Sequence, residues 1–316
     1  METVVCNLCG SAENEALYEM RDWSFISRDI LVRFVRCKQC GLVYQNPRPG
    51  LDEIGAYYPD EYDCYTVDQR ENFRKNWIAR TSFAYGMRRR ISQVTRFCKG
   101  GRLLDIGCAT GNFLEAFARQ PGWSVEGLEI SPFASDIAHQ KGLSVFTGRL
   151  REAGYSSASF DAVTLWDVLE HLHDPCGDLA EISRILKPGG LLVFRVPNLD
   201  SWDANLFKQY WAGFEPPRHL YVFSRHTLAK LLRKTGFTVC SMDTKASRHM
   251  TFMLSLQFRL TDSGAAPTAR AGWIRLLNHP VARLLLAPFF FVYGAGMRGP
   301  LLSVVSQKMP VASRSQ

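Results

Sequence analysis

Arg102-Leu-Leu-Asp-Ile-Gly-Cys-Ala-Thr-Gly111 is the stretch of sequence that decides the fold of this chain. Its first five residues predict a buried strand, and the residues from Gly107 onward predict a tight loop. Residues 112–120 place apolar side chains at helical spacing, and residues 123–130 predict a second strand. A strand, a loop, a helix and a strand in this order are typical of an α/β protein with a mostly parallel sheet.

The glycines and acids around this loop indicate a site for a small ligand. Gly107 and Gly111 let a ligand approach bare backbone, and the helix that follows offers its N-terminal amides. Asp105 can orient the loop or accept from an ammonium group, and Glu129 can accept two hydrogen bonds from a ribose diol. The spacing Asp-x-Gly-x-x-x-Gly differs from the Gly-x-Gly-x-x-Gly of dinucleotide enzymes. Because an amino-acid tail without phosphate suits an acid at this place, the pattern favours S-adenosylmethionine over NAD.

Four motifs in order resemble those of class I S-adenosylmethionine-dependent methyltransferases, of the bacterial small-molecule and glycan group that carries a zinc ribbon in front. They are the glycine loop, the fourth strand with its turn (160–171), the turn into the fifth strand (185–194) and the segment 217–236. The resemblance covers roughly residues 102–243 and the N-terminal cysteines. It implies a Rossmann-like seven-stranded sheet with an N-terminal four-cysteine zinc ribbon and a helical insertion before the last strand.

The resemblance also implies which residues hold the cofactor. The first strand and its loop would hold the methionine part, Glu129 the ribose, and Trp166 and Asp167 would flank the sulfonium. The family usually has an acid after the third strand that contacts the adenine amine, whereas this chain has Arg149 near that place. The adenine is then expected to rely on backbone groups around Leu150. The implied cofactor-binding residues are Asp105, Gly107, Cys108, Gly111, Glu129, Leu150, Trp166 and Asp167.

Two Cys-x-x-Cys-Gly motifs near the N-terminus predict a metal site. The pairs are Cys6 with Cys9 and Cys37 with Cys40, and 27 residues lie between Cys9 and Cys37. Four thiolates suit a tetrahedral zinc ion and leave no open coordination position, so the expected zinc is structural. It would fold a module too small to hold itself together. Nucleic-acid binding by this module is the weaker alternative, because few of its residues are basic.

Composition and charge set the expected compartment. The 316 residues are 46% hydrophobic, enough for one catalytic domain with small additions. The chain shows no signal peptide and no apolar run of 18 residues, and its nine cysteines argue against a disulfide framework, so the cytoplasm is expected. The net charge is +8, and residues 246–316 hold eight Lys/Arg against one Asp, a net +7. In the helix predicted over 71–98, Arg88-Arg89-Arg90 is interpreted as a solvated face.

Histidines are the candidate catalytic residues. Methyl transfer to an alcohol or phenol needs close alignment and a base that removes the proton. His171 follows the fourth strand, and the alternative is that it only supports a turn. His219 lies in a loop after the fifth strand, where substrates bind in such sheets, and the alternative is that it only pins the loop. His173 is expected to be structural, because Asp174-Pro175 predicts the start of a helix.

The segment 246–298 is predicted to be an apolar and basic helical insertion between strands at 237–243 and 301–307, which form an antiparallel hairpin in this fold. Pro280 and Pro288 are expected to break its apolar runs. We expect the insertion to cover the substrate site or to form a homodimer interface. The alternative is an interfacial element on the inner face of the membrane, with its arginines at anionic headgroups, which would suit a lipid-linked acceptor.

The sequence therefore predicts a methyltransferase that uses S-adenosylmethionine on a small-molecule, glycan or lipid-linked acceptor, by O-methylation. Two alternatives remain: a zinc-ribbon adaptor with an inactive domain, and a nucleic-acid methyltransferase. No nucleic acid is expected, because Asp167-Val-Leu-Glu170 stands where amino-methylating nucleic-acid enzymes have Asn-Pro-Pro-Tyr. The expected parts are the ribbon (1–48), a linker and helix (49–99), the cofactor-binding core (100–245), the insertion (246–298) and the last strand and tail (299–316).

Overall fold

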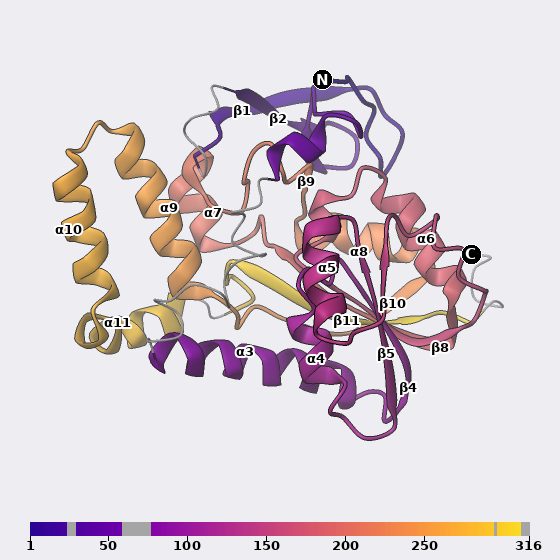
Figure 1. Cartoon of the computed structure of the whole chain (residues 1–316). Coiled ribbons are helices and arrows are strands. Elements are labelled where there is room, and N and C mark those ends of the chain that lie inside the picture. The colour runs from indigo at the N-terminus through magenta and orange to yellow at the C-terminus, as the bar shows by residue number, and fades with distance from the viewer. Residues whose placement is uncertain (24–29, 59–76, 294–295, 311–316) are drawn as a thin grey trace. The chain divides into compact units, whose positions relative to one another are not determined.

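The computed structural model describes residues 1–316 except 24–29, 59–76, 294–295 and 311–316 (Figure 1). The chain forms two compact units, each built from segments that are distant in sequence. Unit 1 contains residues 1–54, 196–230 and 242–303, and unit 2 contains residues 55–195, 231–241 and 304–316. Residues 59–76 of the predicted linker and helix (49–99) lie outside the described residues.

A seven-stranded sheet forms the core of unit 2, in the order β10-β11-β8-β7-β4-β5-β6. The central pairs β7–β8, β4–β7, β4–β5 and β5–β6 are parallel. The last strand, β11, lies between β8 and β10, so the chain returns into the sheet after the insertion. This arrangement confirms the predicted Rossmann-like sheet. Its strands are β4 (Gly101–Ile106), β5 (Trp123–Glu129), β6 (Val145–Thr147), β7 (Phe160–Trp166), β8 (Leu186–Pro197), β10 (Phe237–Asp243) and β11 (Leu301–Lys308).

Helices cover both faces of this sheet. Figure 1 shows α4 (Asn112–Phe117) and α5 (Pro132–Gln140) on one face and α6 (Pro175–Ile185) on the other. The predicted start of α6 is confirmed, because the Asp174 side chain accepts from Gly177 N at 2.9 Å and Pro175 takes the first helical position. The helix predicted over 71–98 is α3 (Trp77–Thr95). One buried apolar cluster of unit 2 contains Met87, Val94, Leu103, Cys108, Phe113, Leu114, Phe117, Ala162, Trp166, Leu191, Val193 and Val305.

Unit 1 contains a four-stranded sheet in the order β1-β2-β3-β9. Strands β1 (Asn14–Arg21), β2 (Leu31–Cys37) and β3 (Val43–Gln45) pair antiparallel, and β9 (Tyr221–Val222) adds to β3 from far along the chain. The helix α7 (Trp202–Phe207) and the turn η3 (Lys208–Tyr210) belong to the same unit. The N-terminal module therefore buries its apolar face with later residues. That core consists of Met20, Val32, Phe34, Val43, Ala204, Phe207, Trp211, Phe214 and Val222.

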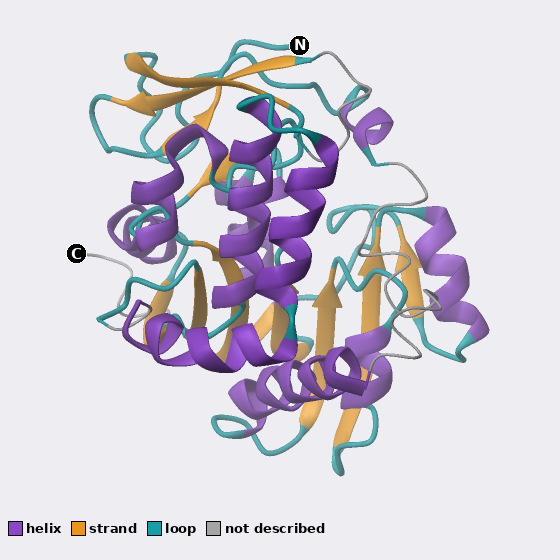
Figure 2. Cartoon of the chain, turned by 90° about the vertical axis from the view of Figure 1, so that its left-hand side faces the viewer, coloured by secondary structure: helices purple, strands orange, loops and turns teal. Residues whose placement is uncertain are grey.

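The insertion forms three successive helices, α9 (Arg248–Asp262), α10 (Pro267–Asn278) and α11 (Pro280–Tyr293) (Figure 2). Within unit 1, α10 packs against α9 and α11, and α9 packs against α7. Pro280 begins α11 as expected, but Pro288 lies inside it. The prediction that Pro288 breaks the run was wrong: the helix continues past the one missing N–H donor. Among the described residues, no helix combines the length and apolar character that a membrane crossing requires.

Candidate functional site

The loop between β4 and α4 has two positions where the backbone requires glycine. Gly107 and Gly111 have φ angles of 68° and 77°, in the left-handed region that side chains disfavour. A Cβ atom on Gly107 would lie 2.5 Å from a methyl group of Val168, and one on Gly111 would lie 2.3 Å from a methyl group of Leu143. Close packing therefore excludes larger residues from both positions, and the loop presents bare backbone at the end of the strand.

Two buried carboxyl groups stand at the ends of the strands that flank this loop. Asp105 Oδ1 accepts from the Thr164 hydroxyl at 2.6 Å, which joins β4 to β7. Asp105 is 2% exposed, and burial raises its pKa to about 7. Glu129 is 4% exposed and accepts from Ala109 N at 2.8 Å and Ser131 N at 2.9 Å. Burial raises the pKa of Glu129 against these two hydrogen bonds. Each carboxylate oxygen retains the capacity for a second bond to a ligand.

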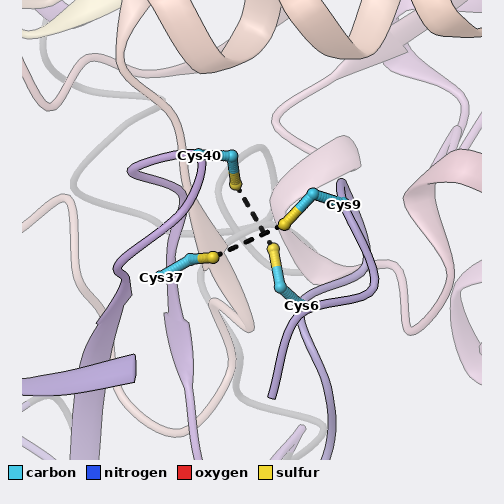
Figure 3. Close-up of side chains that lie close together, drawn as sticks. All are labelled: Cys6, Cys9, Cys37 and Cys40. Atoms are coloured by element: carbon cyan, nitrogen blue, oxygen red, sulfur yellow. Dashed lines mark hydrogen bonds between the residues drawn. The ribbon is translucent and has the colours of Figure 1, made fainter. Parts of the chain in front are cut away.

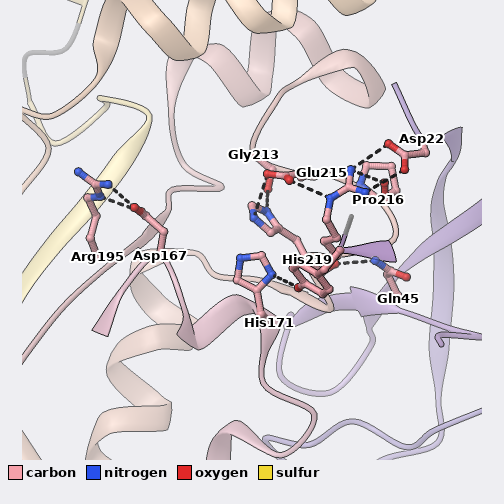
Figure 4. Close-up of polar contacts among 11 residues, drawn as sticks. Asp22, Gln45, Asp167, His171, Arg195, Gly213, Glu215, Pro216 and His219 are labelled. Carbon is pink, nitrogen blue, oxygen red and sulfur yellow. Dashed lines mark hydrogen bonds and ion pairs between the residues drawn. The ribbon is translucent and has the colours of Figure 1, made fainter. Parts of the chain in front are cut away.

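The end of β7 carries a cluster of charged and aromatic side chains. Arg195 forks onto Asp167, with Nε 2.7 Å from Oδ1 and a second bond from Nη2 to Oδ2 (Figure 4). Asp167 has a φ angle of 61°, and left-handed backbone is rare outside glycine, often at functional sites. Arg90 Nη2 lies 3.9 Å from Asp167 Oδ2, and its guanidinium lies 5.2 Å from the centre of the Trp166 ring.

Two members of that cluster were missed from the sequence. Arg90 was interpreted as part of a solvated face, which is wrong, because its side chain is only 26% exposed and lies on Trp166. Arg195 was not singled out. The available signal was a charged residue within the otherwise apolar run 191–197 of β8, because a charge in such a run needs a partner.

The turn after β6, where the adenine edge was expected, carries a carboxylate that was not singled out from the sequence. Leu150 is 6% exposed, as a lining residue would be. Glu152 Oε2 accepts from Arg149 N at 2.7 Å, so an acid lies at this turn although Arg149 replaces the family's usual one. Gly148 N donates to Glu129 O at 2.9 Å, which links the turn to the end of β5.

His171 lies in unit 2, the unit that carries the glycine loop. It ends the short turn η2 (Leu169–His171), and its Nδ1 lies 2.8 Å from Tyr58 Oη. The imidazole is half-buried. A phenol and an imidazole in hydrogen-bond contact can relay a proton, which is the chemistry that a base at this place would need.

His219 lies in unit 1, in a loop that is pinned from several sides (Figure 4). Its Nδ1 lies 2.9 Å from Gly213 O, its Nε2 lies 3.4 Å from Glu215 Oε2, and its own carbonyl accepts from Gln45 Nε2 at 2.6 Å. Because the Gly213 carbonyl can only accept, Nδ1 carries the proton and the lone pair of a neutral His219 resides on Nε2. The imidazole is 6% exposed.

A buried ion pair holds the same loop. Arg218, with a fully buried side chain, forms two bonds of 2.9 Å to the Asp22 carboxylate and a third of 2.9 Å from Nε to Glu215 Oε1 (Figure 4). Such a bidentate pair fixes both residues, because removing one partner leaves a buried charge. Neither Asp22 nor Arg218 stood out in the sequence.

The four N-terminal cysteines converge (Figure 3). Cys6 Sγ and Cys40 Sγ lie 3.5 Å apart, as do Cys9 Sγ and Cys37 Sγ, and all four sulfurs lie within 4.8 Å of one another. Zinc–sulfur bonds of about 2.3 Å in a tetrahedron separate the sulfurs by about 3.8 Å, so the arrangement fits a zinc site with four thiolate ligands. Burial opposes ionisation of Cys37, but the N–H groups of Cys40 and Gln39 lower its pKa to about 7.

Comparison with known proteins gives consistent relatives. A methyltransferase-domain family model matches residues 80–242, just over half of the chain. The ubiquinone biosynthesis O-methyltransferase of Paracidovorax citrulli is 32% identical over 151 residues, which are 45% of this chain and 62% of that protein. An O-methyltransferase of Penicillium expansum is 30% identical over 151 residues, which are 53% of its length. The chain thus matches less than two thirds of either relative. The crystal structure of a SAM-dependent methyltransferase from Archaeoglobus fulgidus matches in fold, with a TM-score of 0.51 and 21% identity, over 77% of this chain and 100% of that one.

Proposed function

Because the chain belongs to the methyltransferase-domain family, we propose that it transfers a methyl group from S-adenosylmethionine to an oxygen of a small-molecule acceptor. The observation that carries the proposal is the glycine loop of unit 2, with Asp105 and Glu129 at the ends of its two flanking strands. Both curated relatives are named as O-methyltransferases, which supports oxygen as the methylated atom.

Each group around the loop has a physical role in this proposal. Asp105 would accept from the ammonium of the methionine part, and an adjacent cation favours the ionised carboxylate. Glu129 would accept from the ribose hydroxyls with the lone pairs that its two amide donors leave. Bound S-adenosylmethionine would supply the electrophilic methyl group. Trp166 and Asp167 would line the part of the site that receives the methyl-bearing sulfonium. Arg90 and Arg195 would hold Asp167 in place.

A histidine would remove the acceptor's proton. His219 is our first choice, because the contact of Nδ1 with Gly213 O leaves the basic lone pair on Nε2. His171 is the alternative, with Tyr58 as its partner. In either case the base acts by holding the acceptor hydroxyl and receiving its proton as the carbon–oxygen bond forms.

We assign structural zinc to the four cysteines. Gly10 and Gly41 follow the two pairs with φ angles of 79°, and their N–H groups donate to Cys6 O at 2.7 Å and Cys37 O at 2.9 Å. These turns direct both sulfurs of each pair to one side, which supports four ligands from two knuckles.

The helices α10 and α11 support attachment to a membrane surface. Seven large apolar side chains on them are 47–75% exposed, and such a patch marks an interaction surface. No acid lies between Pro267 and Tyr293, whereas three arginines do, so anionic headgroups are the complementary partner. A lipid-linked or amphipathic acceptor would be reached at such a surface. The apolar residues are Trp273, Leu276, Val281, Leu284, Leu285, Phe289 and Val292.

The direct test is incubation with methyl-labelled S-adenosylmethionine and a panel of phenols, sugars and lipid-linked sugars. Label that enters an acceptor, and is released by chemistry that cleaves methyl ethers, would support O-methylation. Label in no acceptor of any class, from folded protein that binds the cofactor, would favour the inactive adaptor.

A further inference from the structure

Unit 1 contains a pocket of about 510 Å³ to which the proposed methyl transfer assigns no role. Its lining residues come from four separate parts of the chain, within 36–41, 199–205 and 224–225 and at Arg298. Polar side chains that line it are Arg36, Asp200, Asn205, Ser224, Arg225 and Arg298. The volume is within the range of sites for small ligands.

The pocket is positively charged. Its lining contains three arginines and one aspartate, a net charge of +2. The Asp200 carboxylate is already engaged, because Oδ2 accepts from Arg225 N at 2.9 Å and from Arg225 Nε at 3.2 Å. Among the residues that the structure describes, no carboxylate pairs with Arg36 or Arg298. Two guanidinium groups therefore line the pocket with no carboxylate partner within ion-pair distance in the described part of the chain, although Glu15 lies across the strand from Arg36.

The backbone of Arg36 and the guanidinium of Arg298 are held in position by their surroundings. Arg36 belongs to β2, where its backbone lies opposite Glu15 of β1 and Val43 of β3, and it directly precedes Cys37. The guanidinium of Arg298 lies 5.0 Å from the centre of the Trp202 ring. Stacking on an aromatic face steadies a guanidinium and leaves its in-plane N–H groups for a ligand. Little ordering of the Arg298 side chain therefore remains to be done when an anion binds.

We propose that this pocket binds the phosphate or diphosphate group of a phosphorylated ligand. The planar N–H fork of arginine matches phosphate oxygens, and charge-assisted bonds of this kind are strong. The Asn205 amide and the Ser224 hydroxyl supply neutral donors beside the two arginines. The ribbon strand β2 thus contributes a ligand-binding residue in addition to its structural role. This site does not depend on methyl transfer and is tested without it.

Calorimetric titration of the full-length protein with inorganic pyrophosphate is the test. One pyrophosphate is expected to bind per chain, more weakly as NaCl is raised. Arg36→Gln and Arg298→Gln are each expected to weaken binding about tenfold or more, because each removes charge-assisted bonds to the anion. Arg33→Gln is the matched control, because Arg33 lies on the same strand as Arg36 but pairs with Glu19 at 2.6 Å. This variant is expected to bind pyrophosphate like the wild type.

Vesicles of phosphatidylcholine with phosphatidic acid distinguish the source of the phosphate. Pyrophosphate binding that needs Arg36 and Arg298 assigns the pocket to a soluble phosphate ester. Vesicle binding that needs them, without pyrophosphate binding, assigns it to a lipid headgroup. The two variants alter different segments, and melting temperatures identify any that fails to fold. The proposal is overturned if neither probe shows binding that depends on Arg36 and Arg298.

Discussion

Thr164 donates to Asp105 Oδ1 across 2.6 Å and so joins β7 to β4 where the glycine loop begins. Asp105 is 2% exposed, and its burial raises the pKa to about 7. The carboxyl group is therefore divided between its neutral and ionised forms near neutral pH. A ligand ammonium group would favour the ionised form. Ionising the buried Asp105 carboxylate costs free energy in the unliganded protein, and a bound ammonium group would offset that cost.

Asp105→Asn is expected to be the more stable protein at about pH 8, because the amide keeps the Thr164 bond and cannot ionise. The folded wild type retains the Asp105 proton up to about pH 7, whereas the unfolded chain releases it near the ordinary value of 3.8. The contribution of Asp105 to wild-type stability should therefore decrease as the pH rises from 3.8 to about 7 and stay constant at higher pH. Melting temperatures across this range should move in favour of the variant as pH rises. A difference that is independent of pH would contradict the assigned pKa.

His219→Gln is expected to lower kcat about 100-fold or more while leaving the affinity for S-adenosylhomocysteine unchanged, because a base acts on the acceptor. Steady-state kinetics and calorimetry on the same preparations measure both quantities. His171→Gln and Tyr58→Phe are the comparison pair. Loss of activity and of the acidic limb of the pH–rate profile in His171→Gln alone would transfer the role to the Tyr58–His171 pair.

Cys37→Ser is expected to abolish stoichiometric zinc and to lower the melting temperature, since the free energy of metal binding is part of the free energy of folding. Metal analysis and thermal denaturation provide the two readouts. Cys240→Ser, an exposed cysteine outside the cluster, is the control and should change neither. Wild-type protein that contains no zinc after purification with the metal present would refute the assignment.

Leu284→Ser and Leu285→Ser are each expected to weaken binding to anionic vesicles about tenfold, because each removes one leucine from the apolar area that the membrane would bury. Both leucines are 75% exposed, so the fold should be unaffected. Co-sedimentation with vesicles measures the affinity, and Leu31→Ser, at a position 61% exposed on β2, is the control. Absence of vesicle binding, together with a dimer that these substitutions dissociate, would assign the surface to a second copy of the chain.

Local sequence patterns predicted most of the sheet and much of the loop. The strand over 102–106 and the positive φ angles at Gly107 and Gly111 follow from short-range rules, because a buried strand needs apolar residues and a left-handed turn favours glycine. The convergence of the two cysteine pairs was predicted for a different reason, because four thiolates suit one tetrahedral zinc ion.

Contacts between distant residues could not be predicted in this way. Strand β9 pairs with β3, and Arg218 pairs with Asp22 across 196 residues, and no local pattern encodes such partners. The interpretation of Arg90 was wrong because helical periodicity predicts which helix face a residue is on, but not that Trp166 packs against that face. Pro288 was misread because a helix can lose one hydrogen bond and continue.

Calorimetric titration of the purified protein with S-adenosylhomocysteine tests the central claim most directly. The account predicts one molecule bound per chain, affinity lowered about tenfold or more in Asp105→Ala through loss of the charge-assisted bond to the ammonium, and no binding of NAD. Folded protein that fails to bind S-adenosylhomocysteine, whatever it does with pyrophosphate, would contradict the methyltransferase assignment.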